Sequence, residues 1–74
     1  MVNVCILVRV MPGKVAQVLG AIKALEDVKK AYGAFGRYDI VVFARPADHK
    51  AAARLSHKVH GISGVKSTET LVEG

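Results

Sequence analysis

Two short segments are apolar on both of their alternating faces, and this property constrains the fold most. Residues 2–10 and 40–44 consist largely of Val, Ile, Leu, Phe and Ala. Successive side chains of a β-strand point to opposite sides of the sheet, and a strand with one face in water alternates apolar and polar residues. Here Cys5 and Leu7 lie opposite the valines of the first segment, and Phe43 lies opposite Ile and Val in the second. Because 74 residues are too few to cover both faces of such a sheet, we expect a second copy of the chain to cover one of them.

The size of the chain supports the same expectation. At 7.9 kDa it is a single domain, residues 1–74, and an isolated core of this size is marginal. Small domains compensate with disulfides, metals or oligomerisation. Cys5 is the only cysteine, which excludes an internal disulfide and any CxxC site, and we expect it to be a buried thiol that packs as a small apolar side chain. Oligomerisation is therefore the expected way in which this small domain is stabilised.

Hydrophobic periodicity predicts four strands and two helices. Apolar residues recur every three or four positions in residues 14–25 and 50–60, as in amphipathic helices, with Asp48 a natural N-cap for the second. Gly20, inside the first helix, suggests close packing there. The four remaining segments are typical of strands and comprise residues 2–10, 28–35, 40–45 and 64–72. The middle two form a hairpin, in which Gly33 marks either a bulge or a close backbone approach.

The order β-α-β-β-α-β is that of the ferredoxin-like α+β sandwich. Right-handed crossovers place the first and third strands, which are apolar on both faces, at the centre of the sheet. Residues 25–29 and 62–66 also resemble each other and occupy the same place in each half. Both helices then cover one face of the sheet, and the open faces of two copies would pack into a dimeric α+β barrel.

Neither the charge nor the apolar segments of the chain indicate a nucleic-acid or membrane partner. The net charge is +5, but the eleven basic residues are scattered, so we interpret them as a solvated surface. The N-terminus lacks the features of a signal peptide, and no apolar segment approaches the roughly 20 residues that span a bilayer. We expect a cytoplasmic protein without membrane contact.

No catalytic, phosphate-binding or cofactor motif is recognisable, and no cofactor is expected. All three histidines fall in or beside the second helix. His57 and His60 are spaced to share a face and bind a metal, yet no further ligand stands at a suggestive spacing, so we expect solvent-facing histidines and no metal.

Five residues form the candidate ligand site: Gly36, Tyr38, Asp39, Thr68 and Thr70. Asp39 precedes an apolar strand, where it can cap its own turn or accept hydrogen bonds from a ligand ammonium. Thr68 and Thr70 are two apart and share one face, where they serve either strand pairing or donation to a carboxylate. The pattern alone leaves both alternatives open.

The chain resembles the effector-binding (RAM) domain of the Lrp/AsnC family of transcription regulators. Gly36-Arg37-Tyr38-Asp39 is similar to the G-x-Y-D turn of the family, and Gly64-Val65 with Thr68 and Thr70 is similar to its closing G-V-x-x-T-x-T strand. Regulators of this family carry a helix-turn-helix before this domain, whereas here Met1 directly precedes the first strand. The resemblance is therefore to a stand-alone effector domain, and we expect no sequence-specific binding to nucleic acid.

This resemblance implies a non-enzymatic module that senses a free amino acid, assembles as a ring of dimers and modulates full-length Lrp/AsnC regulators. Asp39 would meet the ammonium, Thr68, Thr70 and the backbone near Gly36 the carboxylate, and Tyr38 would line the pocket. The alternative is a small dimeric α+β-barrel enzyme of the cofactor-free monooxygenase type. An RNA-binding sheet ranks last, because Phe43 is the only aromatic residue on the expected central strands.

Overall fold

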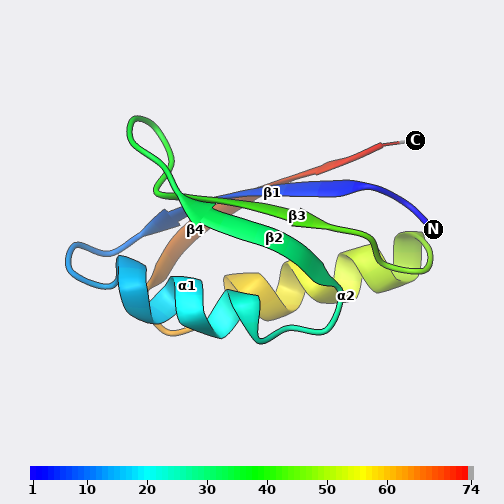
Figure 1. Ribbon diagram of the computed structural model, residues 1–74, viewed down its shortest axis with the longest axis horizontal. Helices are drawn as coiled ribbons and strands as arrows, with labels where there is room; N and C mark the ends of the chain where they lie inside the picture. The colour runs from blue at the N-terminus through cyan, green and yellow to red at the C-terminus, as the bar shows by residue number, and fades with distance from the viewer. Residues whose placement is uncertain (74) are drawn as a thin grey trace.

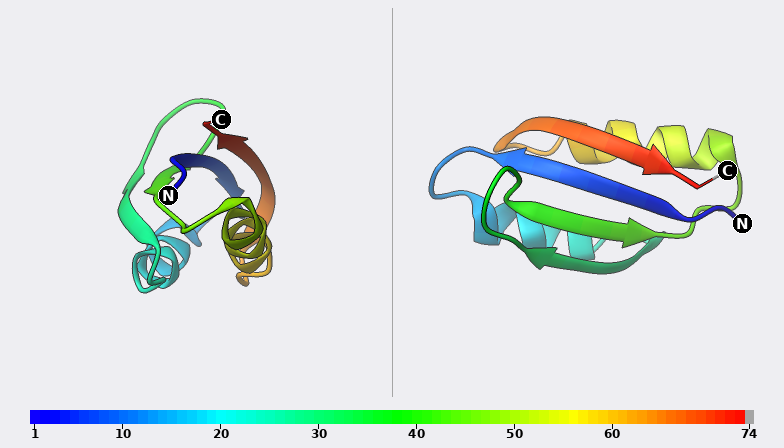
Figure 2. Two further views of the ribbon diagram at one scale, coloured as in Figure 1. Left: turned by 90° about the vertical axis from the view of Figure 1, so that its right-hand side faces the viewer. Right: turned by 90° about the horizontal axis from the view of Figure 1, so that it is seen from above.

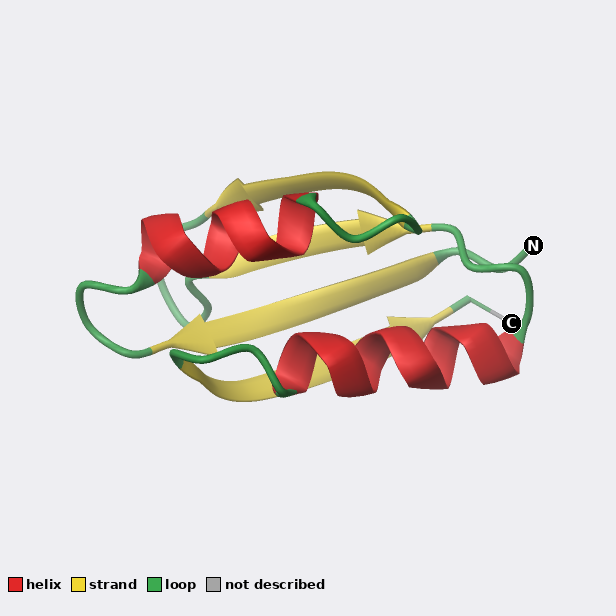
Figure 3. Ribbon diagram, turned by 90° about the horizontal axis from the view of Figure 1, so that it is seen from below, coloured by secondary structure: helices red, strands yellow, loops and turns green. Residues whose placement is uncertain are grey.

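The computed structural model describes residues 1–73 as a four-stranded antiparallel sheet with both helices on one face (Figure 1). The element order is β-α-β-β-α-β, as the periodicity predicts. The elements are β1 (Val4–Val10), α1 (Val15–Lys23), β2 (Val28–Gly33), β3 (Ile40–Ala44), α2 (His49–His60) and β4 (Val65–Val72). Figure 3, seen from below, shows α1 and α2 in front of the sheet, both on the same face. The fold is ferredoxin-like, with the opposite face of the sheet left uncovered by the described residues (Figure 2).

The strand order is β2-β3-β1-β4, so the two strands with apolar residues on both faces do lie at the centre. Val4 pairs with Ala44 on one side of β1 and with Val72 on the other. Ile6 likewise lies between Val42 and Thr70. Since directly paired residues point to the same face of a sheet, this register fixes which side chains of all four strands face the helices.

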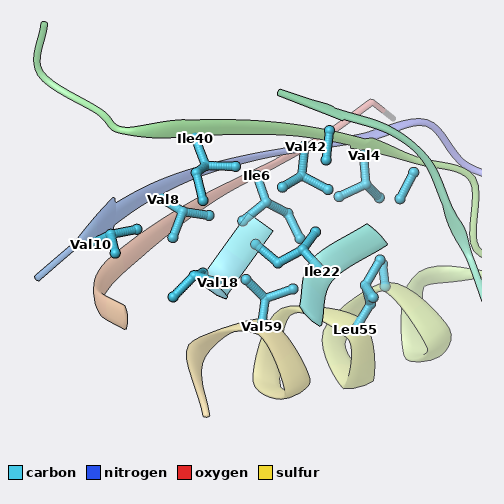
Figure 4. Packing of buried hydrophobic residues seen from close by; sticks show 13 residues of the cluster. Val4, Ile6, Val8, Val10, Val18, Ile22, Ile40, Val42, Leu55 and Val59 are labelled. Carbon is cyan, nitrogen blue, oxygen red and sulfur yellow. The ribbon is translucent and has the colours of Figure 1, made fainter. Parts of the chain in front are cut away.

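The core lies between the sheet and the two helices (Figure 4). β1 contributes alternate residues, and Ile6 and Val8 are fully buried there. α1 and α2 meet them with one apolar stripe each, as expected for helices covering a sheet face. The residues of this cluster are Val4, Ile6, Val8, Val10, Val18, Ile22, Ala31, Ile40, Val42, Ala44, Ala52, Leu55 and Val59.

The helix boundaries follow from local chemistry. Asp48 caps α2, because its Oδ1 accepts a hydrogen bond from the backbone N–H of Ala51 at 2.8 Å. α1 begins at Val15 with no side-chain cap and ends at Lys23, so it is shorter at both ends than the periodicity predicts. Gly20 corrects another expectation: it is exposed, and a Cβ built there meets nothing within 4 Å.

The likeness between the two halves extends to their backbone hydrogen bonds. After α1, Leu25 donates to Ile22, and Val28 donates to Leu25. After α2, Ile62 donates to Val59, and Val65 donates to Ile62. The second half differs in needing Gly64, whose φ is +101° and whose added Cβ would lie 3.1 Å from Val18 Cγ2.

Several sequence-based details were wrong. β2 ends at Gly33, and the irregularity in its pairing falls between Val28 and Lys30, not at Gly33. Cys5 is only partly buried, because it lies on the face of β1 opposite the helices.

Neither helix within residues 1–73 has the length and apolar character needed to cross a membrane.

Candidate functional site

The turn between β2 and β3 contains the first three candidate residues and projects beyond the sheet (Figure 1). Ala34 N–H donates to the Asp39 carbonyl at 2.8 Å and closes the turn. Gly36 has a φ of +120°, a conformation that favours glycine, and nothing lies within 4 Å of a Cβ built there. Tyr38 is half-buried, and Phe35 is fully exposed. The turn therefore presents backbone and one aromatic side chain to any neighbour.

Asp39 joins this turn to the end of β1. Its backbone N–H donates to the Val8 carbonyl at 2.8 Å, and its Oδ2 accepts from the Val10 N–H at 2.8 Å. The carboxylate thus extends the pairing of β1 beyond the first residue of β3. This structural role differs from capping of its own turn, one of the two alternatives that the sequence left open, because the donor is 29 residues away. The second carboxylate oxygen, Oδ1, makes no hydrogen bond within residues 1–73.

Thr68 and Thr70 share one face, as predicted, and the face they share is the one covered by α2. They pair with the core residues Val8 and Ile6 of β1, which fixes their direction. The Thr70 hydroxyl lies 2.7 Å from that of Ser56, and the Thr68 hydroxyl lies 3.4 Å from His60 Nδ1. Within one protomer, the two threonine hydroxyls therefore contact α2, whereas the Asp39 carboxylate contacts the end of β1.

A small pocket of about 170 Å³ opens beside Thr68 and is lined by Ser56, His57, His60 and Thr68. Both histidines are exposed, as expected, yet they border a candidate ligand residue. The sequence offers no signal for this neighbourhood, because it depends on how α2 packs against β4. No group of three or more potential metal ligands occurs within residues 1–73, so this histidine pair has no third ligand of that kind in the protomer.

The sheet face opposite the helices, called here the open face, is apolar at its centre. Cys5, Leu7, Val41 and Phe43 of the two central strands lie on it, and the edge strands add Lys30, Tyr32, Glu69 and Leu71. The rings of Tyr32 and Phe43 lie 6.2 Å apart, and Lys30 Nζ lies 5.5 Å from the Tyr32 ring centroid. Leu71 is 52% exposed and Phe43 41% exposed. Near the chain ends, this face is hollowed into a pocket of about 340 Å³ between Cys5, Phe43 and Leu71.

Comparison with known proteins gives a consistent result. The family profile described as "Lrp/AsnC ligand binding domain" matches residues 3–73. A search of curated proteins finds no match.

Three solved structures illustrate the range of similarity. TTHA0845 from Thermus thermophilus is 28% identical, with a TM-score of 0.95, 100% of this chain covered and 94% of that one. AsnC from E. coli is 26% identical, with a TM-score of 0.87 and 97% of this chain covered, but only 50% of AsnC. A feast or famine regulatory protein (Rv3291c) from M. tuberculosis, complexed with L-methionine, is 18% identical; its TM-score of 0.75, over 99% of this chain and 50% of that one, shows a shared fold.

Proposed function

The chain belongs to the family of Lrp/AsnC ligand-binding domains, and on that basis we propose that its effector is a free amino acid and that it acts without catalysing a reaction. The match over residues 3–73 carries this proposal, since the family is one of regulatory ligand-binding domains. The G-x-Y-D turn at Gly36–Asp39 supports it, because the turn is ordered by Asp39 and held in a glycine-dependent conformation at Gly36. The M. tuberculosis protein of the same fold, complexed with L-methionine, is consistent with an amino-acid ligand.

We assign the two charged ends of the ligand to different groups. Asp39 Oδ1 accepts from the ammonium, while Oδ2 keeps its hydrogen bond with Val10. Thr68, Thr70 and the backbone near Gly36 bind the carboxylate, and Tyr38 lines the pocket. Charge-assisted hydrogen bonds of this kind are the strong ones in proteins, so a small ligand is recognised mainly through its two ends.

The positions of these groups favour a site shared between protomers. β3 and β4 lie on opposite sides of β1, so residues of these two strands that pair with the same part of β1 are two strand spacings apart, about 10 Å. The Thr68 and Thr70 hydroxyls contact α2, whereas the Asp39 carboxylate contacts the end of β1, so we assign the two ends of one ligand to different protomers. We propose that the site lies where dimers built through the open face join into a ring. Full-length Lrp/AsnC regulators, which share this fold, are the proposed partners of mixed assemblies.

A thermal-shift screen of the purified protein against the twenty amino acids tests this function. A ligand that binds only the folded protein adds about 2.7 kcal/mol at 100 times its Kd. We expect one or a few amino acids to raise the melting temperature, and the Asp39→Asn variant to lose at least about tenfold in affinity for them, since one charged hydrogen bond contributes roughly 1.5–3 kcal/mol. Lys50→Gln, at an exposed position on α2, is the matched control that removes a charge far from the turn. Equal shifts in Asp39→Asn and the unmutated protein would remove Asp39 from the site, and no shift with any amino acid would refute the proposed effector class.

A further inference from the structure

The pocket beside Thr68 is lined by hydroxyl and imidazole side chains, all of which can donate hydrogen bonds. Its lining consists of Ser56, His57, His60 and Thr68, none of which is acidic, and its volume is about 170 Å³. An apolar group placed there would leave these polar side chains without partners, which is costly. Because a water molecule takes about 30 Å³, the pocket has room for roughly five groups of that size. It therefore suits a short polar side chain that offers hydrogen-bond acceptors.

The two imidazoles are free to act as donors in this pocket. Both belong to the last turn of α2, where the partial negative charge of a helix C-terminus favours protonated histidine. The backbone carbonyls of His57 and Val59 already accept from Gly61 at 3.0 Å and Ile62 at 3.2 Å, so they compete little for the imidazole N–H groups. The contact of His60 Nδ1 with the Thr68 hydroxyl, 3.4 Å long, leaves Nε2 available to a ligand.

The charged residues next to the pocket also favour an anion. Within α2, no acidic residue occurs from His49 to His60, and Lys58 lies between the two histidines in sequence. On β4, Lys66 precedes Thr68 by two residues, whereas Glu69 pairs with a residue of the open face and therefore points away from α2. A carboxylate in the pocket would thus meet donors and positive charge.

Two acidic residues that lie near α2 border a different hollow. Glu26 and Asp27 line it together with Arg54 and Lys58. Their charges are offset there by the two basic residues, and none of the four lines the pocket beside Thr68. These acids therefore do not oppose an anion between the two histidines.

We propose that the effector is a dicarboxylic amino acid, of the aspartate or glutamate class, whose side-chain carboxylate is held between His57 and His60. This inference rests on the proposed function and adds the class of side chain. In that assignment Thr68 and Thr70 bind the α-carboxylate, and Asp39 of another protomer binds the ammonium. Because Thr68 also lines the pocket, a short side chain bound there extends to the imidazoles. Hydrogen bonds from a protonated imidazole to a carboxylate are roughly twice as strong as neutral ones.

Matched ligand pairs test the class of side chain. We would titrate the unmutated protein calorimetrically with L-glutamate and L-glutamine, and with L-aspartate and L-asparagine, since each pair exchanges a carboxylate for an amide of similar size. EDTA in both solutions excludes a metal ion held by the histidine pair. Histidine ordinarily changes its charge between pH 5 and 8, whereas the ligand carboxylates stay ionised there. We therefore expect the acid to bind about tenfold or more tightly than its amide at about pH 6, with a smaller ratio at about pH 8.

Substitution of the histidines tests the pocket itself. His57→Gln and His60→Gln keep a hydrogen-bond donor but lose the positive charge. Each should weaken binding of the acidic amino acid about tenfold at about pH 6 and change binding of the amide by less than about threefold. His49→Gln is the matched control, because it makes the same change at an exposed position about 12 Å or more away along α2. All three positions are exposed, so the melting temperature without ligand should not change.

The outcomes separate this inference from the function on which it rests. Tighter binding of apolar or amide amino acids than of aspartate and glutamate at both pH values would overturn the dicarboxylic class and leave the amino-acid effector standing. Acid binding that responds to His57→Gln and His60→Gln no more than to His49→Gln would remove the carboxylate from this pocket. Absence of binding by any amino acid would refute the proposed function and this inference together.

Discussion

Replacement of Asp39 by Ala should destabilise the protein even without a ligand. The Ala variant removes the acceptor of the Val10 N–H, a partly buried bond of 2.8 Å that holds the end of β1 beside β3. Hydrogen bonds to charged groups contribute about 1.5–3 kcal/mol, and leaving a buried donor unsatisfied costs a similar amount. Because Val10 is only 6% exposed, water has little access to this region, and we expect a loss of about 2 kcal/mol.

Asp39→Asn is the matched variant, because its amide oxygen can still accept from Val10. It should retain most of the stability and lose about 1 kcal/mol or less, because a neutral hydrogen bond replaces a charge-assisted one. Urea denaturation at fixed protein concentration measures both variants, since oligomerisation makes apparent stability depend on concentration. An Ala variant as stable as the unmutated protein would show that the Asp39–Val10 bond contributes nothing and that Asp39 is free for another role.

Three further predictions test individual contacts. Gly20→Ala should stabilise the protein by up to about 1 kcal/mol, because Gly20 is exposed inside α1 and has open space around it. Gly64→Ala should destabilise the protein, because Gly64 has a positive φ and a Cβ there would lie 3.1 Å from Val18. Denaturation midpoints compare the two variants, and equal effects would contradict this account. Ser56→Ala and Thr70→Val should each lower the free energy of unfolding by about 1 kcal/mol, and the double variant should lower it by little more, because all three remove the same 2.7 Å hydrogen bond. Additive losses in a double-mutant cycle would show that the two hydroxyls act independently. Leu7→Lys should abolish dimers but leave the helical circular-dichroism signal, because Leu7 lies on the open face. Ile6→Lys should prevent folding, because Ile6 is fully buried under the helices. An unchanged dimer in Leu7→Lys would show that the open face is not the interface.

The sequence predicted the architecture well because the relevant signals are local. The apolar character of β1 and β3 on both faces identified them as central strands, and the three- and four-residue spacing located both helices. Asp48 was correctly identified as an N-cap, since capping depends on residues only three positions apart.

The site was harder to predict because its contacts are long-range. That Thr68 and Thr70 share a face follows from the two-residue period of a strand, but which face they occupy depends on the β1–β4 register. A slip of one residue would reverse it, and the pairing is in fact irregular between Arg9 and Val10. The contact of Asp39 with Val10 and the closeness of His60 to Thr68 likewise arise only after packing.

Isothermal titration calorimetry of the unmutated protein with the best amino acid from the thermal screen tests the central claim most directly. Recognition of both charged ends predicts saturable binding of the free amino acid and loss of about tenfold or more in affinity for its methyl ester and for its N-acetyl derivative, each of which removes one charge. Equal binding of the free and blocked forms, or no binding heat with any amino acid across several temperatures, would contradict the assignment of this domain as an amino-acid sensor.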